Sequence, residues 1–522
     1  MFTDSVGLGA KDALPRAFPA DWQVRVDGTP AEMVGEMEHN FVRPRLATNP
    51  EWFGDHVVIA AGYNFPYWNH DRFVREVDSM IETLTAAGVK HVYWMTLREV
   101  KPQYISASAW RQIQPYSWYF PDVNVLLEQA LERHPNLSLV EWRHVADQSG
   151  ITYDAIHLNP TGAALFSSII RQMVDQASTR VPDGSTTRIH VPDGETAAAA
   201  AVNITTTSPR TAGFITTHPC GEVPLVSMHN YVREQVVAHS TIVALDDQGD
   251  FCVTTSRATN LIVDVTGVFE PGLGFTATTP TRWLDTRERP GRAPLADGDV
   301  LELDIDDVRT DAGVSGAPSA VAVSITAAEA AGPGWLRATT CGSTADTSNV
   351  NFLDASPVPN FAIVELDAEG RICIEARTDT QVIVDLFGVF DDEAPVRASP
   401  AVRLYDSRDE GVRVAAQSTT RLAVADAGIA ADVSAVAVNL TAVEPAAVGH
   451  LTVYPCDAGL PLASSLNVTA FLISNAAIVA PDAAGEICVF SHSETHLIVD
   501  VQGDLGAVFS GRTPQRLLDT RG

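Results

Sequence analysis

The chain has 522 residues and a formal net charge of -30, with 45% hydrophobic and 19% charged residues. This composition is typical of folded globular protein, and at about 150 residues per domain the length predicts three or four domains. The acidic balance excludes nucleic acid as a partner and disfavours anionic membrane surfaces, because both require a basic face. No apolar run reaches the ~18–20 residues of a transmembrane segment.

The first third of the chain alternates apolar runs with helical periodicity. We predict strands at residues 23–26, 57–61, 91–95 and 137–142, and helices at 73–84, 123–133 and 163–176. Such alternation indicates a parallel sheet covered by helices on both faces. Ligands bind beyond the carboxyl ends of the strands in sheets of this kind, so we expect a site in the loops that follow them.

A serine stands at one of these places, close to the start of the chain. Ser5 stands in a small loop and precedes the glycines that open a helix, in Thr3-Asp4-Ser5-Val6-Gly7-Leu8-Gly9. A hydroxyl at a helix N-terminus lies among unpaired backbone N–H groups, which can receive the oxyanion formed when a serine attacks an ester. The alternative is a plain helix cap, a common role for serine.

A base for this serine is available about 150 residues downstream. Asp154 precedes His157 by three residues on a predicted loop, so its carboxylate can reach the imidazole and fix its tautomer. His157 would take the proton of the Ser5 hydroxyl and later give it to the leaving alcohol. The candidate oxyanion donors are the Ser5 amide, the Gly28 backbone and Asn64. His157 could instead be a loop histidine that caps the last helix.

These residues resemble the conserved blocks of the SGNH/GDSL hydrolases. The segment around Ser5 matches the first block, Gly-Asp-Ser-x-x-x-Gly, with Thr3 in place of its glycine. Gly62-Tyr63-Asn64-Phe65 matches the third block, Gly-x-Asn-Asp, with phenylalanine where the family has aspartate. Asp154 and His157 match the fifth, and Gly28 is the best match to the second. The resemblance implies a flavodoxin-like, three-layer α/β fold and ester hydrolysis or acyl transfer through an acyl-enzyme, without a cofactor or metal.

Two further features of this region bear on the site. Residues 104–120 are rich in aromatics, which could stack on sugar rings, cover an acyl pocket or pack as a small core of their own. The serine motif also follows Met1-Phe2 directly, whereas a nucleophile normally follows a full buried strand. We therefore expect that the physiological start lies upstream and that a strand and an export signal are lost from this sequence, which contains no signal peptide.

Beyond residue 178 the helical periodicity gives way to short alternating strands that repeat three times. Ala201-Val202-Asn203-Ile204, Ile262-Val263-Asp264-Val265 and Leu284-Asp285-Thr286-Arg287 recur with a period of about 115–121 residues. We predict an α/β domain over 1–178 and three β-sandwich-like units over 179–290, 291–410 and 411–522, each ending with its Asp-Thr/Ser-Arg segment. The units look like repeats of secreted actinobacterial proteins, and we expect the Asp and Arg of each segment to pair structurally.

All six cysteines lie in the repeats. They form three pairs, each separated by 32 positions, which predicts three equivalent disulfides: Cys220 with Cys252, Cys341 with Cys373, and Cys456 with Cys488. Disulfides persist in oxidising compartments, so we expect a secreted or cell-surface protein. A metal site would need closely spaced ligands, and the spacing offers none.

The sequence thus predicts an exported serine esterase that cleaves an acyl ester, with O-acetyl on a carbohydrate as the expected substrate. The β repeats would be accessory domains that hold the enzyme to a cell-envelope polysaccharide. One alternative is a lipase or O-acyltransferase of the same fold, acting on acylated lipid or carbohydrate. Another is a surface adhesion or structural protein whose first domain is catalytically dead.

Overall fold

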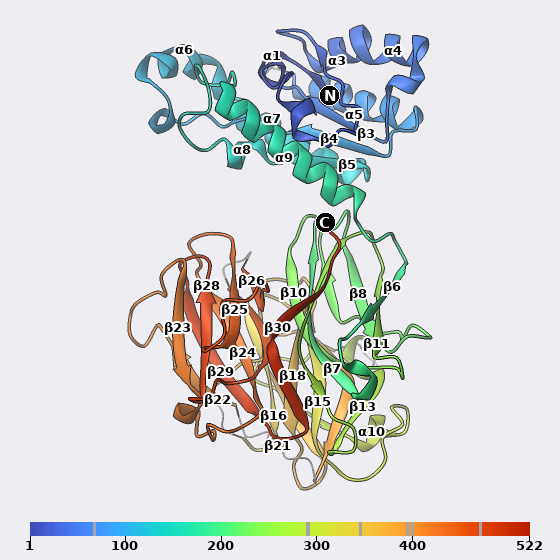
Figure 1. Cartoon of the computed structure of the whole chain (residues 1–522), viewed down its shortest axis with the longest axis vertical. Helices are drawn as coiled ribbons and strands as arrows, with labels where there is room; N and C mark the ends of the chain where they lie inside the picture. The colour runs from blue at the N-terminus through green and yellow to red at the C-terminus, as the bar shows by residue number, and fades with distance from the viewer. Residues whose placement is uncertain are drawn as a thin grey trace. The chain divides into compact units, whose positions relative to one another are not determined.

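The computed structural model describes residues 1–65, 69–288, 293–343, 347–392, 396–397, 401–468 and 472–521. The contacts divide the chain into two compact units, Met1–Thr179 and Arg180–Arg521 (Figure 1). The expected boundary between the first two repeats, at residues 290 and 291, lies outside the described residues, as does Gly522. None of the helices in the described ranges is both long and apolar enough to cross a membrane.

The first unit is built on a parallel sheet of five strands in the order β2-β1-β3-β4-β5. The strands are β1 (Phe2–Thr3), β2 (Asp27–Gly28), β3 (His56–Ala60), β4 (His91–Met95) and β5 (Leu137–Val140). The strand expected at 23–26 is wrong: the chain pairs with β1 only at Asp27 and Gly28. The carboxyl ends of β2, β1 and β3 are therefore neighbours, and the loops that follow them meet at one edge.

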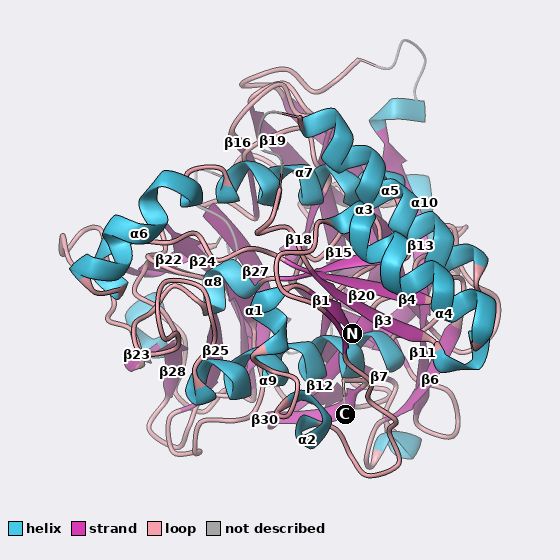
Figure 2. Ribbon diagram, turned by 90° about the horizontal axis from the view of Figure 1, so that it is seen from above, coloured by secondary structure: helices cyan, strands magenta, loops and turns pink. Residues whose placement is uncertain are grey.

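Helices cover both faces of this sheet, as the alternation predicts (Figure 2). Alternate residues of β3 face opposite layers: Val57 and Ile59 pack with α3, α5 and α7, whereas Val58 and Ala60 pack with α1, α2 and α9. The helices are α1 (Ser5–Leu8), α2 (Leu14–Ala17), α3 (Val34–Met37), α4 (Arg43–Thr48), α5 (His70–Ala86), α6 (Ala107–Ser117), α7 (Phe120–Arg133), α8 (Trp142–Val145) and α9 (Pro160–Ser178). The unit is thus a three-layer α/β fold.

The second unit is all-β, apart from short helical turns such as α10 (Asp306–Arg309). Its first repeat contains β6 (Thr186–His190), β7 (Ala199–Thr207), β8 (Gly213–His218), β9 (His229–Tyr231), β10 (Val237–Ala244), β11 (Asp250–Thr255), β12 (Asn260–Phe269) and β13 (Phe275–Asp285). The second contains β14 (Val300–Asp304), β15 (Pro318–Ala328), β16 (Gly334–Thr340), β17 (Val350–Phe352), β18 (Val358–Glu365), β19 (Arg371–Arg377), β20 (Gln381–Asp391), β21 (Val396–Arg397) and β22 (Val402–Asp406). The third contains β23 (Ser418–Ala423), β24 (Ala435–Val443), β25 (Gly449–Pro455), β26 (Leu466–Val468), β27 (Leu472–Val479), β28 (Glu486–Ser491), β29 (His496–Leu505) and β30 (Phe509–Asp519).

These strands form six antiparallel sheets, two for each repeat. Three inner sheets have the orders β10-β7-β12-β30, β13-β20-β15-β18 and β21-β29-β24-β27, the last with β22 also paired to β29. Three outer sheets have the orders β6-β11-β8-β9, β14-β19-β16-β17 and β23-β28-β25-β26. The edge strands β10, β18 and β27 touch one another; β9 touches β18, β17 touches β18 and β27, and β26 touches β10 and β27.

The repeats are therefore not three separate sandwiches, which corrects the expectation from the sequence. The six sheets stand around a common centre, as in a six-bladed β-propeller, although consecutive strands often alternate between the two sheets of a repeat. All three inner sheets contribute to one hydrophobic core, which includes Phe269, Phe275, Phe390 and Phe509. Buried side-chain amides also link the repeats: Asn360 donates a hydrogen bond to Asn439 at 2.8 Å, and Asn475 donates one to Asn203 at 3.1 Å.

Strand exchange corrects a second expectation, that each Asp-Thr/Ser-Arg segment closes its own repeat. β13 pairs with β20 of the second repeat, and β22 pairs with β29 of the third. The last strand, β30, returns to the first repeat and pairs with β12. Each segment thus completes the inner sheet of the next repeat, and the third completes that of the first.

The Asp and Arg side chains of these segments pair with each other, and an arginine just before each segment joins its Asp to the aspartate of the repeated Ile-Val-Asp strand. In the second repeat, Arg287 donates to Asp285, while Arg282 bridges Asp285 and Asp385. Disulfides join Cys220 to Cys252, Cys341 to Cys373 and Cys456 to Cys488, with Cα atoms 4.9 Å apart in each. Each disulfide ties the segment after β8, β16 or β25 to the neighbouring outer strand.

Candidate active site

Ser5 is held at the start of α1 by the turn that leaves β1. The Asp4 carboxylate caps the helix by accepting a hydrogen bond from the Val6 amide at 3.0 Å. Thr3, which replaces the glycine of the family's first block, turns its hydroxyl to the Ala60 carbonyl at 3.1 Å. A Cβ on Gly7 would lie 2.1 Å from that hydroxyl oxygen. Glycine at position 7 therefore makes room for threonine at position 3.

The structure brings together the three residues that the sequence proposed as a triad. Ser5 Oγ lies 3.0 Å from His157 Nε2, and His157 Nδ1 lies 2.7 Å from Asp154 Oδ2. When Nδ1 donates its proton to the carboxylate, Nε2 presents a lone pair to which the serine hydroxyl can donate. Ser5 and His157 are separated by 152 positions in the sequence.

The Asp154 carboxylate is fixed by its own loop. Its Oδ1 accepts hydrogen bonds from the backbone amides of Ile156 and His157, both at 2.9 Å. Partial burial acts to raise the pKa of Asp154, but the hydrogen bonds from the His157 side chain and from these amides outweigh it and lower the pKa below its ordinary value. The side chains of His157 and Asp154 are 43% and 46% exposed, so water reaches the pair.

The candidate oxyanion donors follow neighbouring strands. Gly28 ends β2 and pairs with Thr3. Its φ is +151°, and a Cβ at this position would lie 1.9 Å from the Thr3 carbonyl oxygen, so only glycine fits here. Asn64 follows β3, and its side-chain amide donates to the Glu32 carbonyl at 3.5 Å. Both residues therefore lie at the carboxyl-terminal edge of the sheet, where Ser5 also lies. Phe65, where the family has aspartate, is buried against Phe73.

Asp4 is a component of the site to which the sequence analysis gave no role. Its side chain is fully buried beside Ser5. Burial raises the pKa of the Asp4 carboxyl to about 7, against the opposing effects of the Val6 amide and of His157. The carboxyl therefore keeps its proton to a higher pH than an exposed aspartate does. The sequence signal for Asp4 was its position in the serine motif, directly before Ser5.

Arg98 is a second component that sequence reasoning missed. It follows β4, is 2% exposed, and donates through Nη1 to the Ala155 carbonyl and the Thr152 hydroxyl, both at 2.9 Å. Nη2 donates to the Gln148 carbonyl at 2.7 Å. The guanidinium thus binds three points of the loop that carries Asp154 and His157. Its only sequence signal is its place at the carboxyl end of a predicted strand.

The same arginine is connected to the loop that carries Asn64. The Arg98 amide donates to the Tyr63 hydroxyl at 2.7 Å, and the Tyr63 carbonyl accepts from the Tyr119 hydroxyl at 2.6 Å. Tyr63 therefore joins the loop after β3 to the loop after β4, which carries Arg98. We infer that Arg98 and Tyr63 position the candidate triad without touching the reacting atoms.

The aromatic segment divides into buried and exposed parts. Tyr119 and Phe120 belong to the core, whereas Tyr116 and Trp118 are 61% and 55% exposed. Tyr153, beside Asp154, is 76% exposed, and its amide donates to the His157 carbonyl. The loop of the candidate base thus presents an aromatic ring to solvent.

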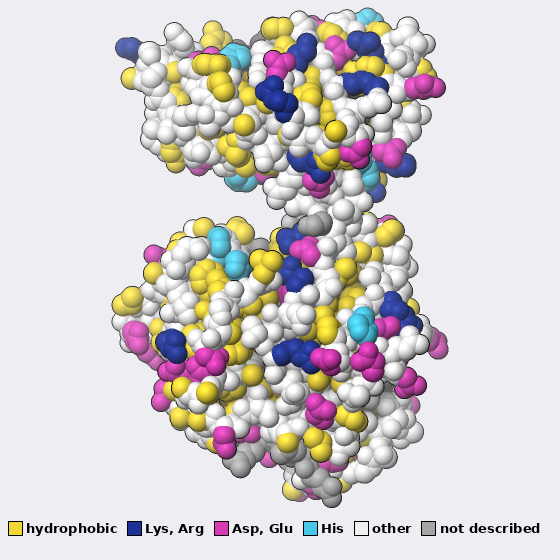
Figure 3. All heavy atoms as spheres, in the orientation of Figure 1, with side chains coloured by type: hydrophobic (Ala, Val, Ile, Leu, Met, Phe, Trp, Pro, Cys, Tyr) yellow, Lys and Arg dark blue, Asp and Glu magenta, His cyan; other side chains and the backbone are white. Residues whose placement is uncertain are grey.

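Among the described residues, one group has metal-ligand proximity: Cys456, Asp482 and Glu486. Cys456 is bonded to Cys488, so its sulfur is not a thiolate that could bind a metal. On the face drawn in Figure 3, basic side chains are scattered among acidic ones and form no continuous basic patch. Neither feature supplies a site for a metal or a polyanion.

No family model and no curated protein matches the chain. Among solved structures, the catalytic domain of peptidoglycan O-acetyltransferase A from Streptococcus pneumoniae is 19% identical, with a TM-score of 0.26 over 34% of this chain and 92% of that one. A lipase/acylhydrolase from Enterococcus faecalis is 16% identical, with a TM-score of 0.26 over 33% and 92%. A psychrotrophic esterase from Pseudoalteromonas is 16% identical, with a TM-score of 0.23 over 34% and 95%. We therefore take the function from the side-chain geometry and not from these likenesses.

Proposed function

We propose that residues 1–179 are an SGNH-type serine esterase in which Ser5 is the nucleophile, His157 the general base and Asp154 its orienting carboxylate. The observation that carries this proposal is the continuous chain of contacts from Ser5 Oγ to His157 and on to Asp154, at 3.0 and 2.7 Å. A serine, an imidazole and a carboxylate in this order activate a hydroxyl for acyl transfer.

The reaction proceeds in two steps, formation of an acyl-enzyme and its hydrolysis. Ser5 Oγ attacks the acyl carbonyl as its proton passes to His157 Nε2, and the oxyanion is received by the Ser5 and Gly28 amides and Asn64. The ester C–O bond then breaks, and His157 returns the proton to the departing alcohol. Water repeats the sequence on the acyl-enzyme, losing its proton to His157 and releasing the acid and free Ser5.

Two features support hydrolysis of an acyl ester, with O-acetyl on a carbohydrate as the expected substrate. The exposed His157 and Asp154 leave water a path to the acyl-enzyme, which favours hydrolysis over transfer to a second alcohol. The exposed ring of Tyr153 stands beside the triad and can pack on the apolar face of a sugar. A lipase or O-acyltransferase would use the same residues with a different alcohol.

We further propose that the protein acts outside the cytoplasm and that the β repeats are its accessory domains. Three disulfides require an oxidising compartment in which to form and persist. The repeats would hold the esterase near an envelope polysaccharide.

The test is turnover of 4-nitrophenyl acetate by the full chain and by Ser5→Ala. We expect the variant to lose at least about 1,000-fold in kcat, because the nucleophile is removed. Ser149→Ala is a matched control, since Ser149 is an exposed serine of the same unit, and it should retain full activity. Equal turnover by Ser5→Ala and the native chain would refute Ser5 as the nucleophile, and no turnover by either would favour a catalytically dead surface protein.

A further inference from the structure

The second unit contains a cavity at the junction of the second and third repeats. It has a volume of about 290 Å³, near the lower end of the range for small-molecule pockets. Its walls come from the outer sheet of the second repeat, through β16, β17 and the residues just before β17, and from the inner sheet of the third repeat, through β22, β24, β27 and β29. The residues that carry the argument are Trp335, Asn351, Arg403, Arg408 and Asp500.

Trp335 gives the cavity a rigid aromatic wall. It lies on β16 and is partly exposed. The guanidinium of Arg337 lies over its ring, 5.2 Å from the centroid, and is itself paired with Glu375. An indole fixed in this way loses little conformational entropy when a ligand packs on it.

Another part of the wall is a hydrogen-bonded network of two arginines and two aspartates. Arg403 donates to Asp500 at 2.5 Å and to Asp406 at 2.8 Å, and Arg408 donates to both oxygens of Asp406. The arginine side chains are 33% and 48% exposed, so the edges of the guanidinium groups reach solvent. The two cations balance the two carboxylates, and the wall offers directed polar groups without a net charge.

We propose that this cavity binds a neutral pyranose, as one unit of a polysaccharide. A pyranose has an apolar C–H face that packs on an indole and a rim of hydroxyls that needs fixed donors and acceptors. Trp335 supplies the first requirement, and the Arg403–Asp500 pair with Arg408 supplies the second. The net charge of -30 on the chain disfavours an acidic polysaccharide. The site rests on none of the residues proposed for ester cleavage.

The other two repeats provide internal controls. Phe214 on β8 and His450 on β25 occupy the place of Trp335, each following the glycine that begins its strand.

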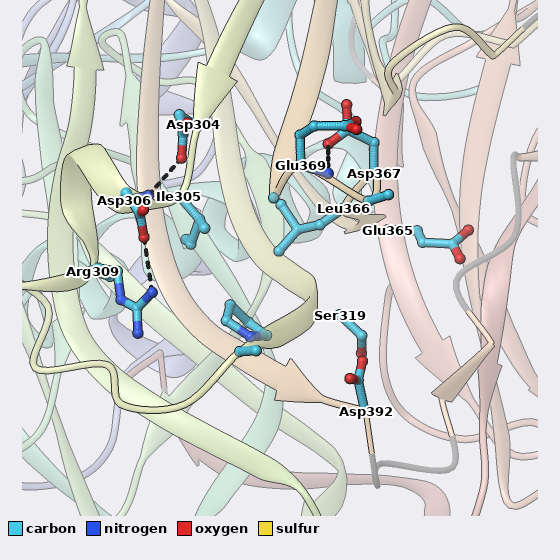
Figure 4. A pocket seen from close by; sticks show the side chains of 14 residues that line it. Asp304, Ile305, Asp306, Arg309, Ser319, Glu365, Leu366, Asp367, Glu369 and Asp392 are labelled. Atoms are coloured by element: carbon cyan, nitrogen blue, oxygen red, sulfur yellow. Dashed lines mark hydrogen bonds and ion pairs between the residues drawn. The ribbon is translucent and has the colours of Figure 1, made fainter.

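A wider cavity of about 490 Å³ in the second repeat has a different character (Figure 4). Its lining includes Asp304, Asp306, Asp367 and Glu369, which are acidic. Asp304 accepts from the Asp306 amide at 2.9 Å, and Asp367 accepts from the Glu369 amide at 3.0 Å. Because Asp304 and Asp367 cap their own turns and Asp306 and Glu369 pair with arginines, we assign no ligand to this cavity.

The experiment measures binding to the full chain by saturation-transfer NMR and calorimetry. The probes are methyl β-glucopyranoside, methyl α-mannopyranoside and methyl β-galactopyranoside, with methyl β-glucuronide as the anionic comparison. We expect at least one neutral glycoside to bind more tightly than the glucuronide. Trp335→Ala should weaken it at least tenfold, whereas Phe214→Ala and His450→Ala should stay within twofold.

Two further variants separate the outcomes. Trp335→Phe keeps an aromatic face and should weaken binding less than Trp335→Ala does. A simple folding defect would not produce this graded loss of affinity. Ser5→Ala should bind sugar as the native chain does, so failure of the esterase proposal leaves this one standing. The proposal is overturned if no neutral glycoside binds at millimolar concentration, if the glucuronide binds best, or if Trp335→Ala binds unchanged.

Discussion

Replacing Arg98 by alanine removes the group that holds the loop of Asp154 and His157. The guanidinium donates three hydrogen bonds to Gln148, Thr152 and Ala155, and it is 2% exposed. Each buried acceptor left without its charged donor costs about 1–3 kcal/mol. Part of the loop is exposed and can turn to water, so we expect the free energy of unfolding of the first unit to fall by about 3 kcal/mol.

The effect on catalysis should be separable from this loss of stability. A displacement of about 1 Å between reacting groups lowers kcat about 100-fold, and the freed loop moves His157 relative to Ser5 by such amounts. We therefore expect Arg98→Ala to reduce kcat for 4-nitrophenyl acetate about 100-fold at a temperature where it is still folded, with a smaller change in KM. Arg98→Lys keeps the charge but not the forked donors, so its kcat should lie between that of the native chain and that of Arg98→Ala.

Arg75→Ala is the matched control, because Arg75 is an exposed arginine of α5 in the same unit. It should change neither kcat nor the melting temperature. If Arg98→Ala kept kcat within threefold of the native chain, the loop of His157 would be positioned by other contacts and the reasoning would be refuted.

Three other predictions follow from buried groups. Burial raises the pKa of Asp4 to about 7, so the folded state binds this proton more tightly than the unfolded state, and the free energy of unfolding falls as pH rises from about 4 to about 7. Asp4→Asn can still cap α1 and should flatten this decline, as measured by calorimetric melting of the first unit. An unchanged slope would assign the decline to other groups. Replacing Cys341 and Cys373 together by serine should lower the stability of the second unit by about 3–4 kcal/mol, measured by denaturant unfolding, because a disulfide restricts the unfolded chain. Arg516→Gln removes the cation beside Asp264, whose side chain is 1% exposed, and should destabilise the second unit by about 3 kcal/mol; a melting temperature like that of the native chain would show that β30 closes the ring without this ion pair.

The sequence predicted the three-layer unit well because its signals are local. Strands such as 91–95 and helices such as α9 carry uninterrupted apolar patterns. The strand expected at 23–26 failed because two extended residues, Asp27 and Gly28, suffice to pair with β1. The position of Gly28 depends on the close approach of the Thr3 carbonyl, which no local pattern encodes.

The repeats show where sequence periodicity stops being informative. The cysteine spacing is a local measure and is the same in all three repeats. Which repeat receives Leu284-Asp285-Thr286-Arg287 is a question of pairing between distant strands, and an apolar alternation fits either neighbour. The exchange of β13 and β30 brings Phe275 and Phe509 into the core that all three inner sheets share, and that core exists only in the assembled repeats.

The candidate site divides in the same way. Ser5, Asp154 and His157 belong to short motifs with recognisable spacing, and the structure brings them together. Arg98 and Tyr63 act through contacts with loops that are distant in sequence, so no motif marks them. Such positioning residues are visible only once the loops are placed side by side.

The central claim is that Ser5 is an activated nucleophile, and covalent labelling tests it most directly. The full chain is incubated with a fluorophosphonate, digested, and the peptide that carries the added mass is identified. The account predicts one stoichiometric adduct on Ser5 in the native chain and in Ser149→Ala, and none in Ser5→Ala. No adduct, or an adduct on another serine in the native chain, would contradict it.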